Sequence, residues 1–282
     1  QNPTPSSIVV RWRTDVPIDS KVQFGSTLAG ISNTILDTTT TTEHRIVVSG
    51  LQPKTSYFYR IGNSSSMFTS ADANVYFTTF PLQNVSIPTR IWAIGDFGKA
   101  NDRQKRVRNA FENYDWERKT DVWLWLGDNA YQDGTDAEYS AKVFDTVFAH
   151  GNLFKRMTFH PAPGNHDYNS FSPVFSTVDP LVQTGTYLDV IDVPKQGENG
   201  GVPSGTKQYY SFNYGEVHFV SINTELASLS NPNHDWLGIG ANADSNFAHS
   251  PMRAWLEQDL QQNTRRFTIV YFHQVPHTAG SH

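Results

Sequence analysis

The apolar run Val122-Trp123-Leu124-Trp125-Leu126 is followed at once by Gly127-Asp128-Asn129-Ala130-Tyr131. A short apolar run that stops at a glycine is typical of a buried strand followed by a turn. This turn carries a carboxylate and, three residues later, a phenol. Both groups offer oxygen ligands suited to iron, manganese or zinc. The stretch therefore predicts a strand whose end presents Asp128 and Tyr131 to a metal ion.

Three more segments repeat this arrangement of an apolar run followed by metal-binding residue types. Gly95-Asp96-Phe97-Gly98 follows one run, Gly164-Asn165-His166-Asp167 follows the next, and His273 follows a third. Strand ends in an open α/β sheet converge on one crevice, so the four segments can meet at one site. An isolated Asp-x-Gly more often marks only a turn, but its recurrence beside other ligand types favours a metal site.

The chain divides into an all-β part and a part in which strands alternate with helices. Four β-rich runs separated by turn residues dominate the first part, at residues 8–13, 21–24, 45–48 and 57–61. We place this domain at residues 1–82. A polar segment with two prolines follows, and we place an α/β domain at residues 88–282.

Three helices are expected in the second part. The spacing of apolar residues predicts helices over residues 102–114 and 136–149. Ser250-Pro251 predicts the start of a third helix. Its buried stripe is expected to contain Trp255, Leu256 and Leu260.

Bulk composition limits the function classes. The chain has 282 residues, a net charge of −5 and a pI near 6.0, a length that suits one large or two ordinary domains. The charge argues against nucleic acid as the main partner, because a phosphate backbone demands a basic surface. The absence of cysteine excludes disulfides and cysteine-ligated metal sites. No apolar run is long enough to span a bilayer.

The ordered patterns Asp-x-Gly, Gly-Asp-x-x-Tyr, Gly-Asn-His-Asp and Val-x-x-His resemble the metallophosphoesterase (calcineurin-like) superfamily. Tyr131 makes the chain similar to the purple acid phosphatase branch. Residues 51–57 resemble the tyrosine corner of a fibronectin type III domain, which this branch commonly carries. The resemblance implies an α/β (α+β) sandwich of mixed sheets flanked by helices, preceded by an all-β fibronectin type III-like sandwich.

The resemblance also implies a dinuclear metal centre. Asp96 and Tyr131 would bind the first metal, Fe(III). Asn165 and His273 would bind the second, which would be Fe(II), Zn(II) or Mn(II). Asp128 would bridge the two metals. Such a pair can clamp a phosphate and acidify a bound water, so that a metal-bound hydroxide attacks phosphorus.

Two histidines complete the implied site. His166 would lie near the substrate phosphate without binding a metal. The leaving group needs a proton, which a histidine near its unperturbed pKa can give. We expect His282 rather than His277 in this role, because the family often places a substrate-facing histidine nine residues after the ligand that corresponds to His273.

One motif of the family is absent from the chain. A later Gly-His-x-His would give one histidine to each metal, yet the sequence ends at Gly280-Ser281-His282, and it opens with Gln1 rather than Met. We therefore expect a catalytic domain truncated at its C-terminus, with a weakened ferric site. On this hypothesis the chain is a fragment of a longer enzyme.

The leading hypothesis is hydrolysis of phosphate monoesters by a secreted or periplasmic acid phosphatase that acts on small phosphorylated substrates. A phosphodiesterase or nucleotidase on the same scaffold is the nearest alternative. A binding or adhesion protein with a degenerate enzyme domain is another. A protein kinase is suggested by Asp96-Phe97-Gly98 but rejected, because the sequence has no glycine-rich phosphate loop before it and no His-Arg-Asp loop.

Overall fold

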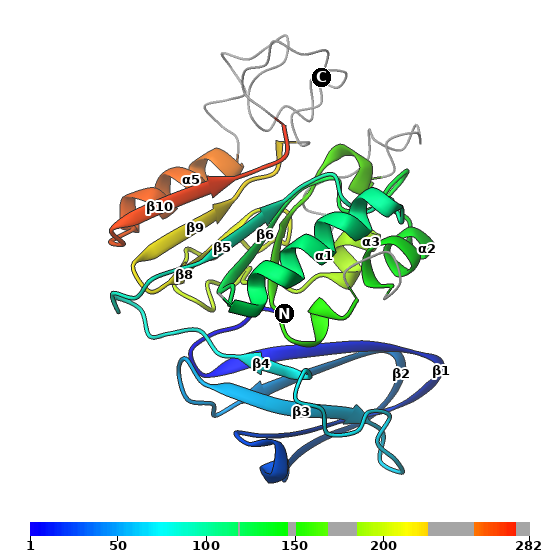
Figure 1. The fold of residues 1–282 in the computed structure, drawn as a ribbon. Helices are drawn as coiled ribbons and strands as arrows, with labels where there is room; N and C mark the ends of the chain where they lie inside the picture. The colour runs from blue at the N-terminus through cyan, green and yellow to red at the C-terminus, as the bar shows by residue number, and fades with distance from the viewer. Residues whose placement is uncertain (118, 146–150, 169–184, 225–250, 275–282) are drawn as a thin grey trace. The chain divides into compact units, whose positions relative to one another are not determined.

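The computed structural model describes residues 1–117, 119–145, 151–168, 185–224 and 251–274. The chain forms two compact units. The first comprises Gln1–Val85 with Asn152–Thr158, and the second comprises Ser86–Gly151 with Phe159–His282. Strands dominate the first unit, whereas helices and strands share the second (Figure 1).

The first unit is built on one antiparallel sheet with the strand order β2-β1-β3-β4. Its elements are β1 (Ser7–Gly25), η1 (Leu28–Gly30), β2 (Asn33–Ser49), β3 (Ser56–Gly62), β4 (Tyr76–Thr78) and η3 (Leu153–Lys155). Apolar residues on one face of the strands pack into a core around Val22, Val48 and Phe77. Burial of such side chains is the main force that holds a small sheet together.

Two features of the first unit bear on the sequence predictions. The β-rich runs at residues 8–13 and 21–24 are not separate strands but parts of one long β1. Its register against β2 shifts between Arg13 and Ile18, and such irregularities let a strand bend without ending. The backward bond of a tyrosine corner is present, because the backbone N–H of Gln52 donates to the hydroxyl of Tyr57 at 2.9 Å.

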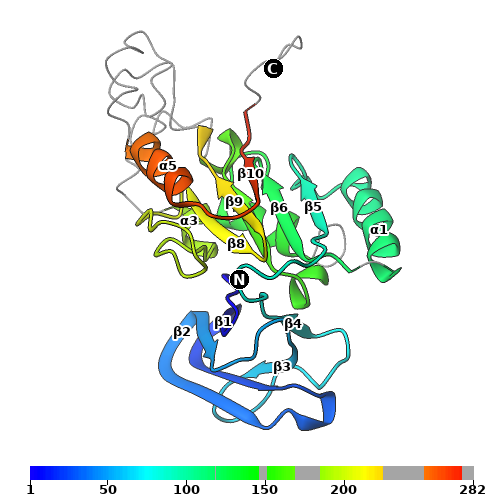
Figure 2. The same cartoon turned by 90° about the vertical axis from the view of Figure 1, so that its left-hand side faces the viewer.

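The second unit contains two three-stranded sheets. In the sheet β5-β6-β7 all strands are parallel; in the sheet β10-β9-β8, β10 is parallel to β9 and β8 is antiparallel to it. The elements are β5 (Ile91–Ile94), α1 (Asp102–Glu117), β6 (Val122–Leu126), α2 (Asp136–Glu138), η2 (Tyr139–Phe144), β7 (Phe159–Ala162), η4 (Asn165–Tyr168), α3 (Thr186–Val190), β8 (Tyr210–Tyr214), β9 (Val217–Ser221), α5 (Pro251–Gln262) and β10 (Phe267–Tyr271). Figures 1 and 2 both show α1 beside β5 and α5 beside the sheet that contains β9 and β10. The predicted class of mixed sheets flanked by helices is confirmed.

The two sheets of the second unit pack together where β7 meets β8. The ring of His160 on β7 stacks on the ring of Phe212 on β8, with centroids 4.1 Å apart. The hydroxyl of Tyr210 donates to the carbonyl of Pro161 at 2.9 Å. These side chains are buried, so aromatic packing together with the hydrogen bond from Tyr210 joins the two sheets.

The predicted helices are confirmed in part. The helix at residues 102–114 is α1, and α5 begins at Pro251 as expected. In the segment 136–149, α2 and the π-helical η2 end at Phe144, and residues 146–150 lie outside the described part of the chain.

The buried face of α5 differs from the prediction at one position. Leu260 was expected inside but is 42 % exposed, whereas Met252, Trp255 and Asp259 are buried. Successive helical residues are rotated by about 100°, so burial of Asp259 turns Leu260 outward. Asp259 can lie inside because its carboxylate pairs with His218 at 2.7 Å.

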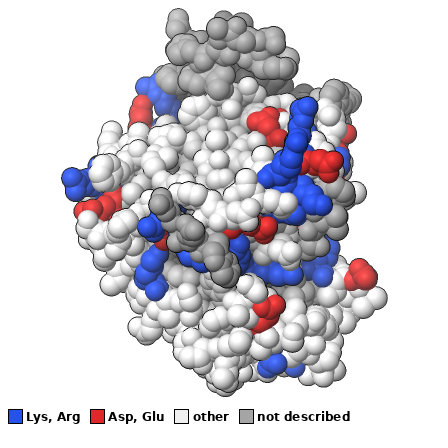
Figure 3. Space-filling view, in the orientation of Figure 1, with Lys and Arg blue, Asp and Glu red and all other residues white. Residues whose placement is uncertain are grey.

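The surface around α1 carries charges of both signs. Four basic residues lie in the first half of this helix, at positions 103, 105, 106 and 108. Figure 3 shows acidic side chains among the basic ones in this region, rather than a purely basic surface.

None of the helices in the described residues combines the length and apolarity needed to cross a bilayer.

We expect acid to destabilise the second unit through His160. Burial lowers the pKa of this side chain to about 3, whereas the unfolded chain should titrate near pH 6.5. The folded pKa is depressed, so this contribution to stability is complete above pH 6.5 and is lost as pH falls toward 3. From pH 7 to pH 5 the loss should be about 2 kcal/mol.

Urea unfolding followed by tryptophan fluorescence at pH 7 and pH 5 measures this loss. A His160→Phe variant keeps an aromatic ring for Phe212 but cannot take up a proton, so its stability should fall less between the two pH values. Equal losses in variant and wild type would show that His160 is not responsible.

Candidate metal centre

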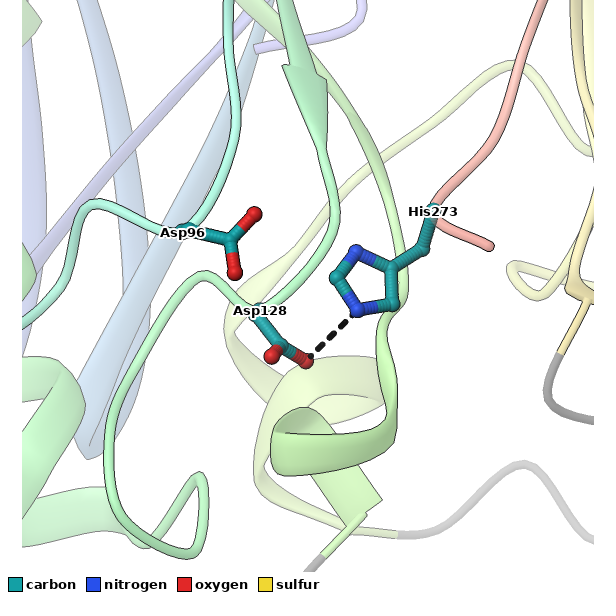
Figure 4. Close-up of side chains that lie close together, drawn as sticks. All are labelled: Asp96, Asp128 and His273. Atoms are coloured by element: carbon teal, nitrogen blue, oxygen red, sulfur yellow. Dashed lines mark ion pairs between the residues drawn. The ribbon is translucent and has the colours of Figure 1, made fainter. Parts of the chain in front are cut away.

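The structure brings five of the sequence-predicted side chains together at the ends of four strands. Asp96 follows β5, Asp128 and Tyr131 follow β6, Asn165 opens the η4 turn after β7, and His273 follows β10. One ligand atom each from Asp96, Asp128 and His273 lies within 4.8 Å of the others. Figure 4 shows the two carboxylates and the imidazole turned toward one another.

Tyr131 connects the two carboxylates. Its hydroxyl oxygen lies 2.5 Å from Asp96 Oδ1 and 2.9 Å from Asp128 Oδ2. A phenol has only one proton, so it cannot donate to both carboxylates at once. Burial, followed by the hydrogen bond to Asp96 and the charge of Asp128, raises the pKa of Tyr131 far above its ordinary value. Without a cation the phenol therefore stays protonated.

Asp128 lies at the centre of the cluster. Its Oδ1 accepts from the backbone N–H of His166 at 2.9 Å and lies 3.3 Å from Nε2 of His273. Burial by itself raises the pKa of this carboxyl group, but hydrogen bonds from His273 and from the His166 backbone outweigh it, so the pKa lies below its usual value. Asp128 is therefore an anion at neutral pH.

The two site histidines are held with one ring nitrogen each facing the carboxylates. His273 Nδ1 lies 2.9 Å from the carbonyl of Leu126, and His166 Nδ1 lies 2.6 Å from the carbonyl of Gln132. A carbonyl only accepts, so Nδ1 carries a hydrogen in both rings. His273 Nε2 then faces Asn165 Oδ1 at 3.1 Å, and His166 Nε2 lies 3.8 Å from Asp128 Oδ2. Such backbone partners are the usual way to orient a metal-binding imidazole.

The backbone at the strand ends adopts a left-handed conformation. Asp96 has φ +56° and Asp128 has φ +51°, values that aspartate tolerates better than most residues. Gly127, with φ +86°, has a second reason to be glycine: a Cβ there would lie 2.5 Å from the Cβ of His273. The tight turn after β6 and the approach of β10 thus depend on the same residue.

Asp167 holds together the segments that follow β6 and β7. Its buried carboxylate accepts from the side-chain N–H of Asn129 at 2.9 Å, the hydroxyl of Tyr139 at 2.6 Å and the backbone N–H of Gly164 at 2.8 Å. Burial raises the pKa of Asp167 to about 6. These partners belong to the segments after β6 and β7, so Asp167 links the two segments.

Replacement of Asp167 by asparagine should loosen the site without removing a ligand. The amide turns an N–H group toward at least one existing donor, which should cost about 1–3 kcal/mol of stability. Metal affinity should fall by about 10- to 100-fold, as for other groups that support ligands. Unfolding and metal titration measure both effects. Asp189→Asn, at an exposed carboxylate, is the matched control, and a variant indistinguishable from it would contradict this role.

The residues present fit a pair of cations. Asp96, Asp128 and Tyr131 place three oxygen donors together, and Asn165 and His273 add an amide oxygen and an imidazole nitrogen beside Asp128. This is a hard and borderline donor set of the kind that iron, zinc and manganese accept. The single proton of the Tyr131 hydroxyl can be donated to only one of the two carboxylates, Asp96 or Asp128. A bound cation would attract both carboxylates at once.

The remaining sequence predictions for the site have different outcomes. His282, the expected proton donor, lies outside the described residues, as does His277. Two supporting residues were not predicted from the sequence: Gln132, which accepts from His166, and Tyr139, which donates to Asp167. Gln132 acts through its backbone carbonyl, and Tyr139 has no motif of its own, so no local signal marked them.

Both parts of the chain match known protein families. Residues 89–282 match the calcineurin-like phosphoesterase family, and residues 1–79 match the N-terminal domain of purple acid phosphatases. The chain therefore belongs to the calcineurin-like phosphoesterases, and it has the domain combination of a purple acid phosphatase. This confirms the family that the motifs predicted.

Individual relatives agree with this assignment. The chain is 26 % identical over 256 residues to purple acid phosphatase 23 of Arabidopsis thaliana, covering 84 % of this chain and 48 % of that protein. It is 26 % identical over 286 residues to acid phosphatase type 7 of Mus musculus, covering 92 % and 52 %. The chain thus spans about half the length of these relatives.

A solved structure shows the same fold. Purple acid phosphatase PPD1 from yellow lupin (Lupinus luteus) is similar with a TM-score of 0.67 at 18 % identity, over 98 % of this chain and 50 % of that one.

Proposed function

We propose that this protein hydrolyses phosphate monoesters with a dinuclear metal centre, as an acid phosphatase. The observation that carries the proposal is the convergence of Asp96, Asp128, Tyr131, Asn165 and His273 on one point at the strand ends. Family membership of the chain supports the same chemistry. Small phosphorylated molecules are the substrates we propose.

The proposed ligands divide around Asp128. Asp96 and Tyr131 would hold one cation, Fe(III), and Asn165 and His273 would hold the other, Fe(II), Zn(II) or Mn(II). Asp128 would serve both, because its two oxygens already face the two groups separately. When bound, such a pair supplies positive charge that clamps a phosphate and acidifies water.

His166 is the residue we propose to meet the substrate. Its Nδ1–H donates to the Gln132 carbonyl, and its Nε2 faces Asp128. A protonated Nε2 could donate to a phosphate oxygen and so orient the ester. We propose His282 as the donor of a proton to the leaving group.

Comparison of an aryl phosphate monoester with the matching diester tests the function. We expect faster turnover of the monoester, loss of turnover after chelation and its return with iron plus zinc or manganese. Retained activity in the metal-stripped protein would overturn the metal-dependent mechanism, and preference for the diester would favour a phosphodiesterase. We also propose a secreted or periplasmic location, which fractionation of the producing cells would test.

A further inference from the structure

A lysine ammonium lies against the face of the tyrosine in the candidate centre. Nζ of Lys99 is 4.0 Å from the centroid of the Tyr131 ring, well within the range of a cation–π interaction. Lys99 itself is exposed. None of the sequence patterns pointed to this lysine.

Hydrogen bonds to Gln104 hold the backbone at Lys99 in place. Its N–H lies within hydrogen-bonding distance of the side-chain oxygen of Gln104, at 3.0 Å, and the N–H of Ala100 donates to the same oxygen at 2.7 Å. Gln104 is buried, and its amide donates in turn to the carbonyl of Lys142 at 2.8 Å. The loop that carries Lys99 is therefore tied to two other parts of the unit.

Hydrogen bonds also hold Tyr131 in place at both its backbone and its hydroxyl group. Its backbone N–H donates to the carbonyl of Gly98 at 2.9 Å, one residue before Lys99. Its hydroxyl points at Asp96 and Asp128. The carboxylates thus lie beside the oxygen. The ring of His166 packs against the Tyr131 ring, with centroids 4.5 Å apart, and Nζ of Lys99 lies over the Tyr131 ring, so the lysine charge acts on the ring.

We propose that Lys99 is a positioning residue of the metal centre, whose charge over the Tyr131 ring stabilises the negative charge that this tyrosine carries as a ligand. The proposal rests on the proposed function. A phenolate spreads part of its charge into the ring, so a cation over the ring is attracted more strongly than to a neutral phenol. Lys99 thereby offsets the repulsion that two neighbouring carboxylates exert on a phenolate.

The effect has a spectroscopic signature that a solvated surface lysine would not produce. A positive charge near the phenolate lowers its filled orbitals, which raises the energy of charge transfer from tyrosinate to iron. Removal of the charge in Lys99→Met should therefore move the visible band to longer wavelength. A shift of about 10–20 nm is expected for one unit charge at this distance, partly screened by solvent.

The test uses the protein purified from the producing cells and loaded with iron. Iron content and melting temperature are measured for every variant. Lys99→Arg keeps the charge and should keep the band near its wild-type position. Lys119→Met removes an exposed lysine elsewhere in the unit, whose side chain is 54 % exposed, and should leave the band unchanged.

The outcomes separate the two proposals. A coloured wild type whose band stays in place in Lys99→Met, at equal iron content, overturns the role of Lys99 alone. An iron-loaded wild type with no such band overturns the ferric tyrosinate centre and the role of Lys99 together. A band displaced in Lys99→Met and restored in Lys99→Arg supports the proposal.

Discussion

Asp128→Asn should abolish metal-dependent turnover while leaving the second unit folded. Asp128 is the carboxylate that both halves of the candidate centre share, because Oδ2 faces Tyr131 and Oδ1 faces His273. An asparagine retains one oxygen and no charge, so it cannot serve two cations. Loss of several kcal/mol of metal-derived stabilisation corresponds to a fall in kcat/KM of about a thousandfold or more.

The same variant should keep its backbone. Asp128 has φ +51°, and asparagine is among the few residues that adopt this left-handed conformation readily. We therefore expect an unchanged circular dichroism spectrum and a melting temperature close to that of the metal-free wild type. Metal analysis should find substantially less than two ions per chain.

Asp189→Asn again makes the same change of charge at an exposed position and should alter neither activity nor metal content. An Asp128→Asn protein that holds two metals and keeps more than about a tenth of the activity would contradict the bridging role.

Gly164→Ala should damage the site through sterics alone. A Cβ on residue 164 would lie 2.3 Å from the backbone nitrogen of Asp128 and 2.5 Å from its Oδ1. The nearest obstacle is backbone, which cannot swing aside as the end of a flexible side chain can. Overpacking of this kind costs about 1–3 kcal/mol, and the relaxation must displace Asp128 from its neighbours. Metal affinity should therefore fall along with stability.

Gly50→Ala is the control for this substitution. Gly50 has φ +75° and open space around its missing Cβ, so alanine there costs only backbone strain of about 1–2 kcal/mol. Gly50 lies in the first unit, and metal affinity should be unchanged. Chemical denaturation with calorimetric metal titration separates the two effects. Wild-type metal affinity in Gly164→Ala would show that the loops tolerate a methyl group at this contact.

Much of the candidate centre could be predicted from the sequence, and the reason is local. Each proposed ligand directly follows an apolar run, and β5, β6 and β7 are parallel neighbours. Their carboxyl ends must then lie at one edge of the sheet. Asp96, Asp128 and Asn165 could therefore be placed together without any knowledge of long-range contacts.

Other features could not be predicted, because the signal for them lies in contacts between distant residues. The exposure of Leu260 follows from the burial of Asp259, which depends on a partner 41 residues away, His218. Lys99 looks like any solvated lysine in its own segment, and only the position of the Tyr131 ring gives it a partner.

By itself the sequence determined the family, the fold class and the residue types at each strand end. These are carried by short apolar runs and by the ligands that follow them, and both are local properties of a chain. Only the tertiary structure decided which nitrogen of each histidine faces the site, and which residues hold the ligands in place. The carbonyl of Leu126 that orients His273 lies 147 residues earlier in the chain. Contacts of that range form only when the two sheets pack, because burial of their shared core brings the strand ends together.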